Sequence, residues 1–266
     1  MTLRIVITGA SGVLGTAVRE AFVNAHHEVL GLSYTRSGEG LVQLDLTQEA
    51  EVEKLFADFK PNYFDKDNLQ ASPDYVFDGT SPPYTPSSPT NPLQSYGQSK
   101  RDGELAVLAV SGASVIVLRV PVLYGPAPKN SDSAINILLD VVQDQSGKIY
   151  KMDHYATRYP TNVVDIAHFL VRLSDRKDYI PPILHYSAAE PYTKYEMCLV
   201  FAKILNLPHN HIIPDAQPPT GTEATTRPRD CQLYTRETED LHIAENRDAS
   251  LGLSLFEEWW TTYLKK

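Results

Sequence analysis

Two side chains four positions apart, Tyr96 and Lys100, have the types and spacing that suit proton transfer. Residues at positions i and i+4 lie on one face of a helix, so the ammonium of Lys100 can lie close to the phenol of Tyr96. We expect this neighbour to lower the pKa of the phenol and to hold a ribose hydroxyl, so that Tyr96 donates a proton to a carbonyl as a cofactor delivers hydride. The same spacing is also typical of an ordinary surface helix in a chain with 15 tyrosines.

A glycine-spaced turn between an apolar strand and a helix supports the chemical interpretation. The strand runs over residues 4–8. Gly9 permits the tight turn, Gly12 lets the main chain approach a pyrophosphate, and Gly15 allows close packing of helix on strand. The helix N-terminus then presents free N–H groups and its positive dipole end to the phosphates. The sequence therefore predicts a dinucleotide site, rather than a turn without a ligand, formed by Gly9, Ser11, Gly12, Val13, Leu14 and Gly15.

The end of the second predicted strand, residues 28–32, indicates which dinucleotide is bound. NAD enzymes place an acidic residue there for the ribose hydroxyls, whereas this chain has Ser33, Tyr34, Thr35 and Arg36. Because no carboxylate repels a 2′-phosphate and Arg36 can pair with one, NADP(H) is favoured over NAD(H). The alternative for Arg36 is a solvated loop residue.

Composition and charge exclude several other classes of protein. The chain has 266 residues, of which 42% are hydrophobic, enough for one large domain with a lobe. Its net charge of −9 argues against nucleic acid or an anionic membrane as a main partner. Cys198 and Cys231 are too few for a disulfide framework and lack metal-ligand spacing, so no metal is expected. A strand begins by Leu3 and no apolar run approaches ~20 residues, so we expect neither a signal peptide nor a membrane span, and a cytoplasmic location.

The G-x-x-G-x-x-G turn and the Y-x-x-x-K spacing together resemble the extended short-chain dehydrogenase/reductase superfamily. The resemblance implies an aspartate near the adenine ring, which Asp45 matches, and a catalytic set of Tyr, Lys and Ser or Thr. The hydroxyl position of that set directly precedes the aspartate of D-Y-V-F-D-G and is held here by Pro73, which has neither a hydroxyl nor an N–H. Ser72 is the nearby substitute, and the sequence leaves open whether it reaches the site.

The same resemblance implies a Rossmann-like α/β fold with a doubly wound parallel sheet and a small C-terminal substrate-binding lobe. The NADP-binding domain would comprise residues 1–125, completed by 160–187, and the lobe would comprise 126–159 and 188–266. Apolar patterning predicts further strands over 42–46, 114–120 and 181–187, helices over 51–59 and 194–205, and a loop over 207–219.

One connection is too short for this fold. A complete fold would place a strand, its helix and a second strand between the helix at 51–59 and the D-Y-V-F strand that begins at Asp74, but only residues 62–73 are present, without strand periodicity. A βαβ crossover needs roughly 30 residues, so one strand, one helix and most of a second strand, some 35 to 40 residues, are missing. The first strand then lacks its usual neighbour, although buried backbone groups must be bonded. Either a splice variant or mispredicted gene model has lost an exon, which we favour, or the sheet is rebuilt.

A stretch that begins at Met152 gives a more specific resemblance. Reductases of dTDP-4-dehydrorhamnose have a related P-T-x-x-x-D-h-A stretch, and the longer form M-D-H-x-x-x-R-[YF]-P-T-x-V-x-D is similar to the regulatory β subunits of methionine adenosyltransferase. The motifs D-Y-V-F-D-G-T-x-P-P-Y, T-K-Y-E-M and R-P-R-[ND] agree. This resemblance implies an NADP(H)-binding protein that associates with a methionine adenosyltransferase catalytic subunit in S-adenosylmethionine biosynthesis, with Arg158 and Thr161 as candidate residues of the substrate lobe.

Two functions therefore remain open. The first is such a regulator, favoured by the loss of the hydroxyl at Pro73; the second is an NADPH-dependent reductase of a nucleotide-linked keto-deoxysugar, with Tyr96 as proton donor and Lys100 as its activator. A truncated product without function is a third. Residues 256–266 match poorly the tail that docks the regulatory family to its partner, and we expect their tryptophans to pack a final helix onto the lobe.

Overall fold

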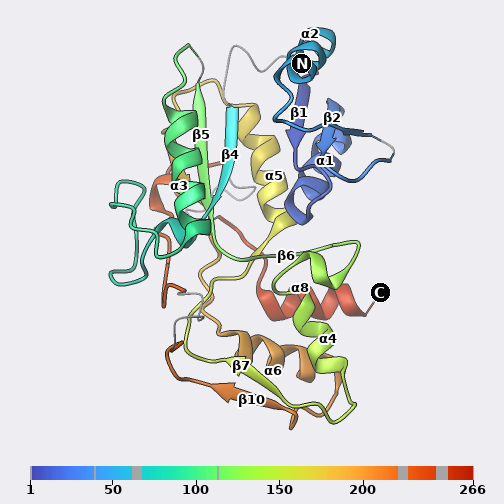
Figure 1. The fold of residues 1–266 in the computed structure, drawn as a ribbon, viewed down its shortest axis with the longest axis vertical. Coiled ribbons are helices and arrows are strands. Elements are labelled where there is room, and N and C mark those ends of the chain that lie inside the picture. The colour runs from blue at the N-terminus through green and yellow to red at the C-terminus, as the bar shows by residue number, and fades with distance from the viewer. Residues whose placement is uncertain are drawn as a thin grey trace.

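The computed structural model describes residues 2–38, 40–61, 68–112, 114–220, 227–243 and 251–265. Strands and helices alternate along the first half of the chain and continue through the second (Figure 1). The first half contains β1 (Arg4–Thr8), α1 (Val13–Asn24), β2 (Glu28–Ser33), β3 (Leu41–Gln43), α2 (Glu49–Phe59), β4 (Asn68–Pro73), α3 (Ser95–Leu108) and β5 (Val115–Val120). The second contains β6 (Leu123–Tyr124), α4 (Ile137–Gln143), β7 (Tyr150–Asp153), β8 (Thr161–Asn162), α5 (Val163–Ser174), β9 (Ile183–His185), α6 (Lys194–Leu205), β10 (Ile212–Asp215), α7 (Arg236–Glu239) and α8 (Phe256–Leu264).

The strands form parallel ladders in two separate three-stranded sheets. One has the order β1-β2-β3, with Ile5 opposite Val29, and the other has the order β4-β5-β9, with Leu118 opposite Leu184. Parallel strands covered by helices on both faces are typical of doubly wound α/β proteins. The predicted α/β class with parallel strands is therefore confirmed.

The two sheets share one hydrophobic core. Helices α1 and α5 pack side by side and cover one face, while α3 packs against β4 and β5. Buried residues from β1, α1, β5, α5 and β9 meet in a single cluster that includes Ile5, Phe22, Leu118, Phe169 and Leu184. The helices thus join the sheets although no described ladder does.

The break between the sheets lies at the short connection noted in the sequence. Only residues 60–67 separate α2 from β4, and β4 occupies residues 68–73, where we expected no strand; that expectation is wrong. The D-Y-V-F residues 74–77, expected as a strand, begin instead with a 3-10 turn over Asp74–Val76. The second of the strands expected to be missing is therefore present, and among the described residues no strand pairs with both β1 and β4 to join the two sheets.

A separate apolar core lies outside the two three-stranded sheets. It combines residues of α4, α6 and α8, with Trp260 and Phe256 fully buried, so the expected packing of the final helix onto the lobe is confirmed. The predicted loop over 207–219 is partly wrong, because β10 pairs in parallel with β7 there. Residues 227–243 belong by their contacts to the sheet half, since Leu233 packs with Phe77, and Ile243 joins the larger core.

Candidate functional site

The glycine turn after β1 forms a cradle that a side chain would fill. Gly9 has φ +63°, a conformation that L side chains rarely adopt. A Cβ on Gly12 would lie 3.3 Å from the carbonyl oxygen of Gly9, and a Cβ on Gly15 would overlap that oxygen. Gly12 is the N-cap of α1, so the free N–H groups of the first helical turn open toward the turn. The residues present therefore fit the pyrophosphate of a dinucleotide.

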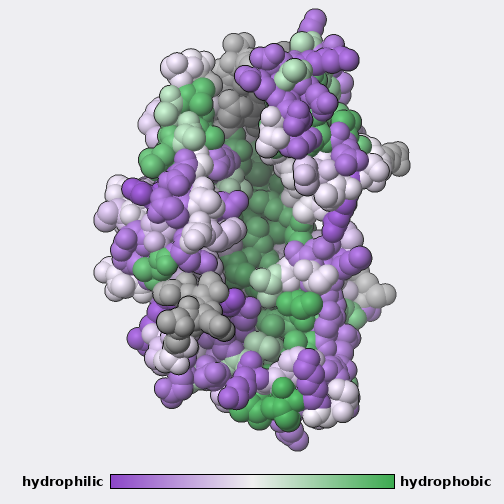
Figure 2. All heavy atoms as spheres, viewed as in Figure 1, coloured by the Kyte–Doolittle hydropathy of each residue, from purple (hydrophilic) through white to green (hydrophobic). Residues whose placement is uncertain are grey.

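A groove of about 1000 Å³ runs from this turn between β1 and β4. Figure 2 shows an apolar floor in the hollow of this face. The three glycines, Val13 and Leu14 line the groove together with Tyr96 and Lys100. The structure thus brings together seven of the residues that the sequence assigned to the cofactor.

Arg36 lies over the glycine turn but is already engaged. Its guanidinium donates to the carbonyl oxygen of Ser11 at 2.9 Å and to the carboxylate of Asp132 at 3.1 Å. The Ser11 hydroxyl lies 2.9 Å from that of Ser33, at the end of β2. A 2′-phosphate at this point would have to displace Asp132 from Arg36, which sequence reasoning did not anticipate.

Asp45 lies apart from the groove. The predicted strand ends early, at Gln43, and Asp45 follows it in an exposed turn. Its carboxylate accepts from the backbone N–H and the hydroxyl of Thr47, and these hydrogen bonds lower its pKa. Asp45 is absent from the residues that line the groove, and its role at an adenine ring stays a prediction.

Tyr96 and Lys100 lie near the start of α3, with the Lys100 ammonium 5.4 Å from the centre of the Tyr96 ring. Tyr96 is 51% exposed. Burial of the remainder raises the pKa of its phenol, and the charge of Asp74 raises it further. The expected lowering of this pKa by Lys100 is therefore not found. The pair can still bind a ribose hydroxyl and present a protonated phenol to a ligand.

A second cavity, of about 360 Å³, lies beside the same pair. Ser72, at the end of β4, lines it with Tyr96 and Lys100; the residue is 1% exposed, and its hydroxyl has no hydrogen-bond partner. Ser72 therefore lies beside the Tyr96–Lys100 pair, and its role in the catalytic set stays a prediction. Pro73 also lines the cavity and offers no polar group.

Asp74 in this cavity was missed by sequence reasoning. It is buried, and burial raises its pKa to about 7, against the opposing charge of Arg158. The motif D-Y-V-F-D-G begins at Asp74, but the protonation of Asp74 depends on its burial and on Arg158, which is far away in the sequence. At neutral pH the protonated and ionised forms of this carboxyl are therefore both populated.

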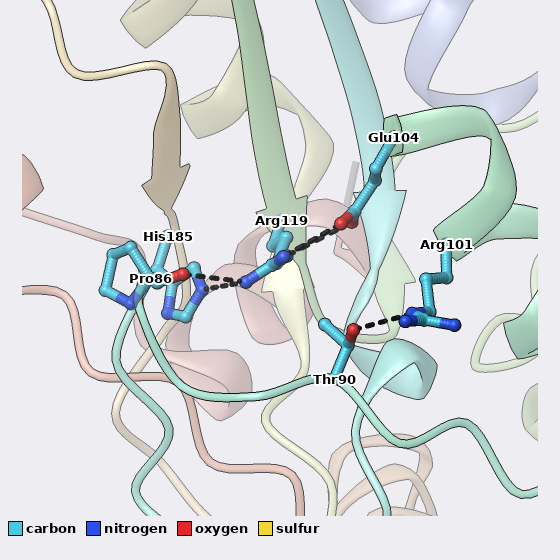
Figure 3. Close-up of polar contacts among 6 residues, drawn as sticks. All are labelled: Pro86, Thr90, Arg101, Glu104, Arg119 and His185. Carbon is cyan, nitrogen blue, oxygen red and sulfur yellow. Dashed lines mark hydrogen bonds and ion pairs between the residues drawn. The ribbon is translucent and has the colours of Figure 1, made fainter. Parts of the chain in front are cut away.

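A buried ion pair fixes helix α3 on the sheet (Figure 3). Arg119, on β5, donates to the carboxylate of Glu104 at 2.8 Å and to the carbonyl oxygen of Pro86 at 3.2 Å. Its Nη1 lies 3.4 Å from Nε2 of His185, on β9, and burial followed by the charge of Arg119 lowers the pKa of His185 to about 3. Glu104 follows Lys100 by four residues, so the pair sets the rotation of the helix face that carries Tyr96. Sequence reasoning assigned no role to Arg119 or His185.

The two candidate residues of the lobe are buried, and neither lines either cavity. Arg158 is 4% exposed and donates to the carbonyl oxygens of Thr157 and Pro228, and its Nη2 has no hydrogen-bond partner. The hydroxyl of Thr161 donates to Tyr159 and accepts from the N–H of Ala188. Thr161 therefore holds backbone together, and a ligand role for either residue stays a prediction.

Two absences concern only the described part of the chain. None of its helices combines the length and apolar character needed to cross a membrane. Within the same ranges, no group of three or more His, Cys, Asp or Glu residues is placed to hold a metal ion.

Family models match almost the whole chain in two parts. Residues 67–256 match the RmlD substrate binding domain, and residues 5–64 match the NAD dependent epimerase/dehydratase family. The boundary between the two matches falls at the short connection before β4.

Curated relatives are similar to this chain over most of its length. Methionine adenosyltransferase 2 subunit beta of Xenopus tropicalis is 38% identical, covering 94% of this chain and 86% of the relative, and the Rattus norvegicus protein of that name is 33% identical, covering 99% and 89%. The Xenopus alignment spans 290 positions but includes only about 250 of these 266 residues, so about 40 positions of the relative have no counterpart here. That length agrees with the shortfall expected from the sequence.

Solved structures at lower identity share the fold. A dTDP-4-dehydrorhamnose reductase from Clostridium acetobutylicum superimposes with a TM-score of 0.77 at 20% identity, covering 98% of each chain. WbmG of Bordetella bronchiseptica, in complex with NAD, gives 0.77 at 20% identity, covering 100% of this chain and 94% of that one.

Proposed function

Because this chain belongs to the RmlD-like extended short-chain dehydrogenases/reductases and, among them, to the family of methionine adenosyltransferase 2 β subunits, we propose that it is a dinucleotide-binding regulatory subunit of a methionine adenosyltransferase. In this role it binds the catalytic subunit in the cytoplasm and modulates S-adenosylmethionine synthesis. The observation that carries the proposal is the 38% identity to such a subunit over 94% of the chain.

The site itself favours regulation over catalysis. Pro73 holds the position of the catalytic hydroxyl, and the pKa of Tyr96 is shifted upward, which weakens both the hydrogen bonding of a substrate carbonyl and the ionisation of the phenol. A binding protein needs neither property. The glycine cradle, which holds a ligand without reacting with it, is intact.

The dinucleotide of this proposal is a nicotinamide dinucleotide, and specifically NADP(H). The N–H groups at the start of α1 would hold its pyrophosphate, and Tyr96 and Lys100 would hold a ribose. When bound, the nicotinamide supplies hydride. Arg36 is the one cation at the glycine turn among the proposed cofactor residues, and it would exchange Asp132 for a 2′-phosphate.

We expect the substitution Arg36→Met to weaken NADPH binding about tenfold and to leave NADH binding unchanged, because a charge-assisted contact to phosphate is lost. Titrations followed by cofactor fluorescence measure both affinities. Equal losses for the two cofactors would contradict the assignment of NADP(H).

The regulatory role is tested by the kinetics of S-adenosylmethionine synthesis. A fixed amount of catalytic subunit is titrated with this chain, and we expect a saturable change in kcat or in the KM for methionine. A rate independent of the added chain would contradict regulation.

A second function is favoured by one specific observation, the unpartnered hydroxyl of Ser72 in the cavity shared by Tyr96 and Lys100. Ser72 would then bind the carbonyl of a nucleotide-linked keto-deoxysugar while Tyr96 donates the proton. This reductase would lose turnover in Tyr96→Phe and retain NADPH binding. An unchanged rate in that variant would remove Tyr96 from the mechanism.

A further inference from the structure

Two strand edges face each other across the groove. β1 pairs with β2 on one side, β4 pairs with β5 on one side, and among the described residues neither has a ladder partner on its other side. Residues of both edges line the same groove, Ile5 to Thr8 from β1 and Leu69 to Ala71 from β4. Within the described part of the chain, the two edges thus border a position that no strand fills.

The exposure of these strands shows that the position is open. β5, which is paired on both sides, is buried at five of its six residues. β1 has only Ile5 buried, and Thr8 and Ala71 are exposed. Inner strands of parallel sheets are normally buried along their length. β1 and β4 therefore behave as edge strands at the centre of the molecule.

The chemistry of the groove matches one kind of occupant. Its floor is apolar, formed by Val18 and Phe22 of α1 and by Leu170 and Leu173 of α5 (Figure 2). Its two sides are backbone edges, whose N–H and C=O groups pair with another extended backbone. A strand of five residues, the length of β1, spans about 16 Å.

We propose that the groove between β1 and β4 is a strand-acceptor site, which binds one extended apolar segment of another polypeptide, parallel to β1 and β4. Binding of this kind takes its affinity from main-chain hydrogen bonds and its specificity from side-chain pockets. The inserted strand would join the two sheets into one and would cover the exposed side chains of β1.

The length of the relatives supports a polypeptide as the occupant. They carry about 40 positions without counterpart in this chain. That exceeds the roughly 30 residues of a βαβ unit, so a strand with its crossover helix fits the difference. This inference is independent of the proposed regulatory function.

The probe is a synthetic peptide of five consecutive valines flanked by two lysines at each end. Its control is the same peptide with proline in place of the central valine, because proline lacks the N–H donor and is excluded from central strands. Calorimetric titration of the full chain measures affinity, and hydrogen exchange of the complex reports which amides become protected. We expect the valine peptide alone to bind and to protect β1 and β4.

Two variants of the chain locate the site. Ala71→Glu places a carboxylate on β4 among the residues that line the groove, and we expect it to weaken binding on the order of tenfold or more, because the bound peptide would cover an unpaired charge. Val42→Glu places the same charge on the exposed outer strand β3 and should leave binding unchanged. Ala71 is exposed, so its substitution spares the core. No binding at millimolar peptide, equal effects of the two variants, or protection confined to β3 would overturn the proposal.

Discussion

Gly15 lies where α1 crosses the glycine turn, and the close approach of helix and strand depends on its missing side chain. A Cβ there would overlap the carbonyl oxygen of Gly9 and crowd the Cα of Ala10. We expect Gly15→Ala to lower the free energy of unfolding by about 1–3 kcal/mol and to abolish NADPH binding, because the turn must open.

Gly38→Ala is the matched control for this prediction. Nothing lies within 4 Å of a Cβ built on Gly38, so urea unfolding and cofactor titration should both match the unmodified chain. Comparable losses in the two variants would show that the close approach at Gly15 has no special role.

Asp74 makes the stability of the protein depend on pH. Its pKa is about 7 in the folded chain and 3.8 when exposed, so its neutral form stabilises the fold fully below pH 3.8. This contribution is lost as pH rises through 7, because the unfolded chain has by then released the proton. We expect the stability difference between Asp74→Asn and the unmodified chain to shift in favour of the asparagine variant between pH 4.5 and 7.5, measured by urea unfolding.

His185 makes stability depend on pH in the opposite direction to Asp74. Its pKa is about 3 in the fold and 6.5 when exposed, so protonation of the unfolded chain removes stability below pH 6.5. Both chains carry His185, so its effect cancels in the difference. A difference that is constant with pH would contradict the raised pKa of Asp74.

Some features of the candidate site could be predicted from the sequence and others could not. The glycine turn, Tyr96 and Lys100 could be predicted because their function depends on local spacing, and they line one groove. The raised pKa values of Tyr96 and Asp74 could not, because they depend on burial and on charges from remote segments.

Helix α3 is positioned by the Glu104–Arg119 pair rather than by caps of its own. Its N-cap Gln94 makes no side-chain hydrogen bond, whereas Glu104 and Arg119 are 2% and 3% exposed. Removal of one partner from a buried pair leaves an uncompensated charge. We therefore expect Glu104→Gln to lower the free energy of unfolding by about 3 kcal/mol.

The exposed pair of Glu28 with Arg4 provides the comparison. Glu28→Gln should cost about 1 kcal/mol or less, since solvent screens such pairs. Denaturant titration of both variants measures the difference. Equal and small effects would mean that the buried pair does not hold the helix.

Elements with a strong apolar period were predicted well, and those that depend on distant partners were not. α6 has the predicted bounds, and its capping box of Thr193 and Glu196 is a local signal. β4 was not predicted, because it contains Asn68 and Gln70 and lacks the apolar run of an inner strand. Its residues 69–71 line the groove. β10 forms by pairing with β7, and no local sequence pattern predicts that pairing.

At the scale of the whole molecule, the reductase-like framework persists although the strands that the structure describes form two separate three-stranded sheets. α1 and α5 pack on each other across the break, and one hydrophobic core joins both sheets. The lobe keeps a separate core around Trp260. The two sheets are therefore held together by the helices that pack on them.

The most direct test of the regulatory proposal is sedimentation velocity of a methionine adenosyltransferase catalytic subunit mixed with this chain. We predict a new, faster species that contains both chains and that saturates as this chain is added, and that persists in Tyr96→Phe because assembly does not require the phenol. Independent sedimentation of the two proteins at every ratio would contradict the assignment of this chain as a regulatory subunit.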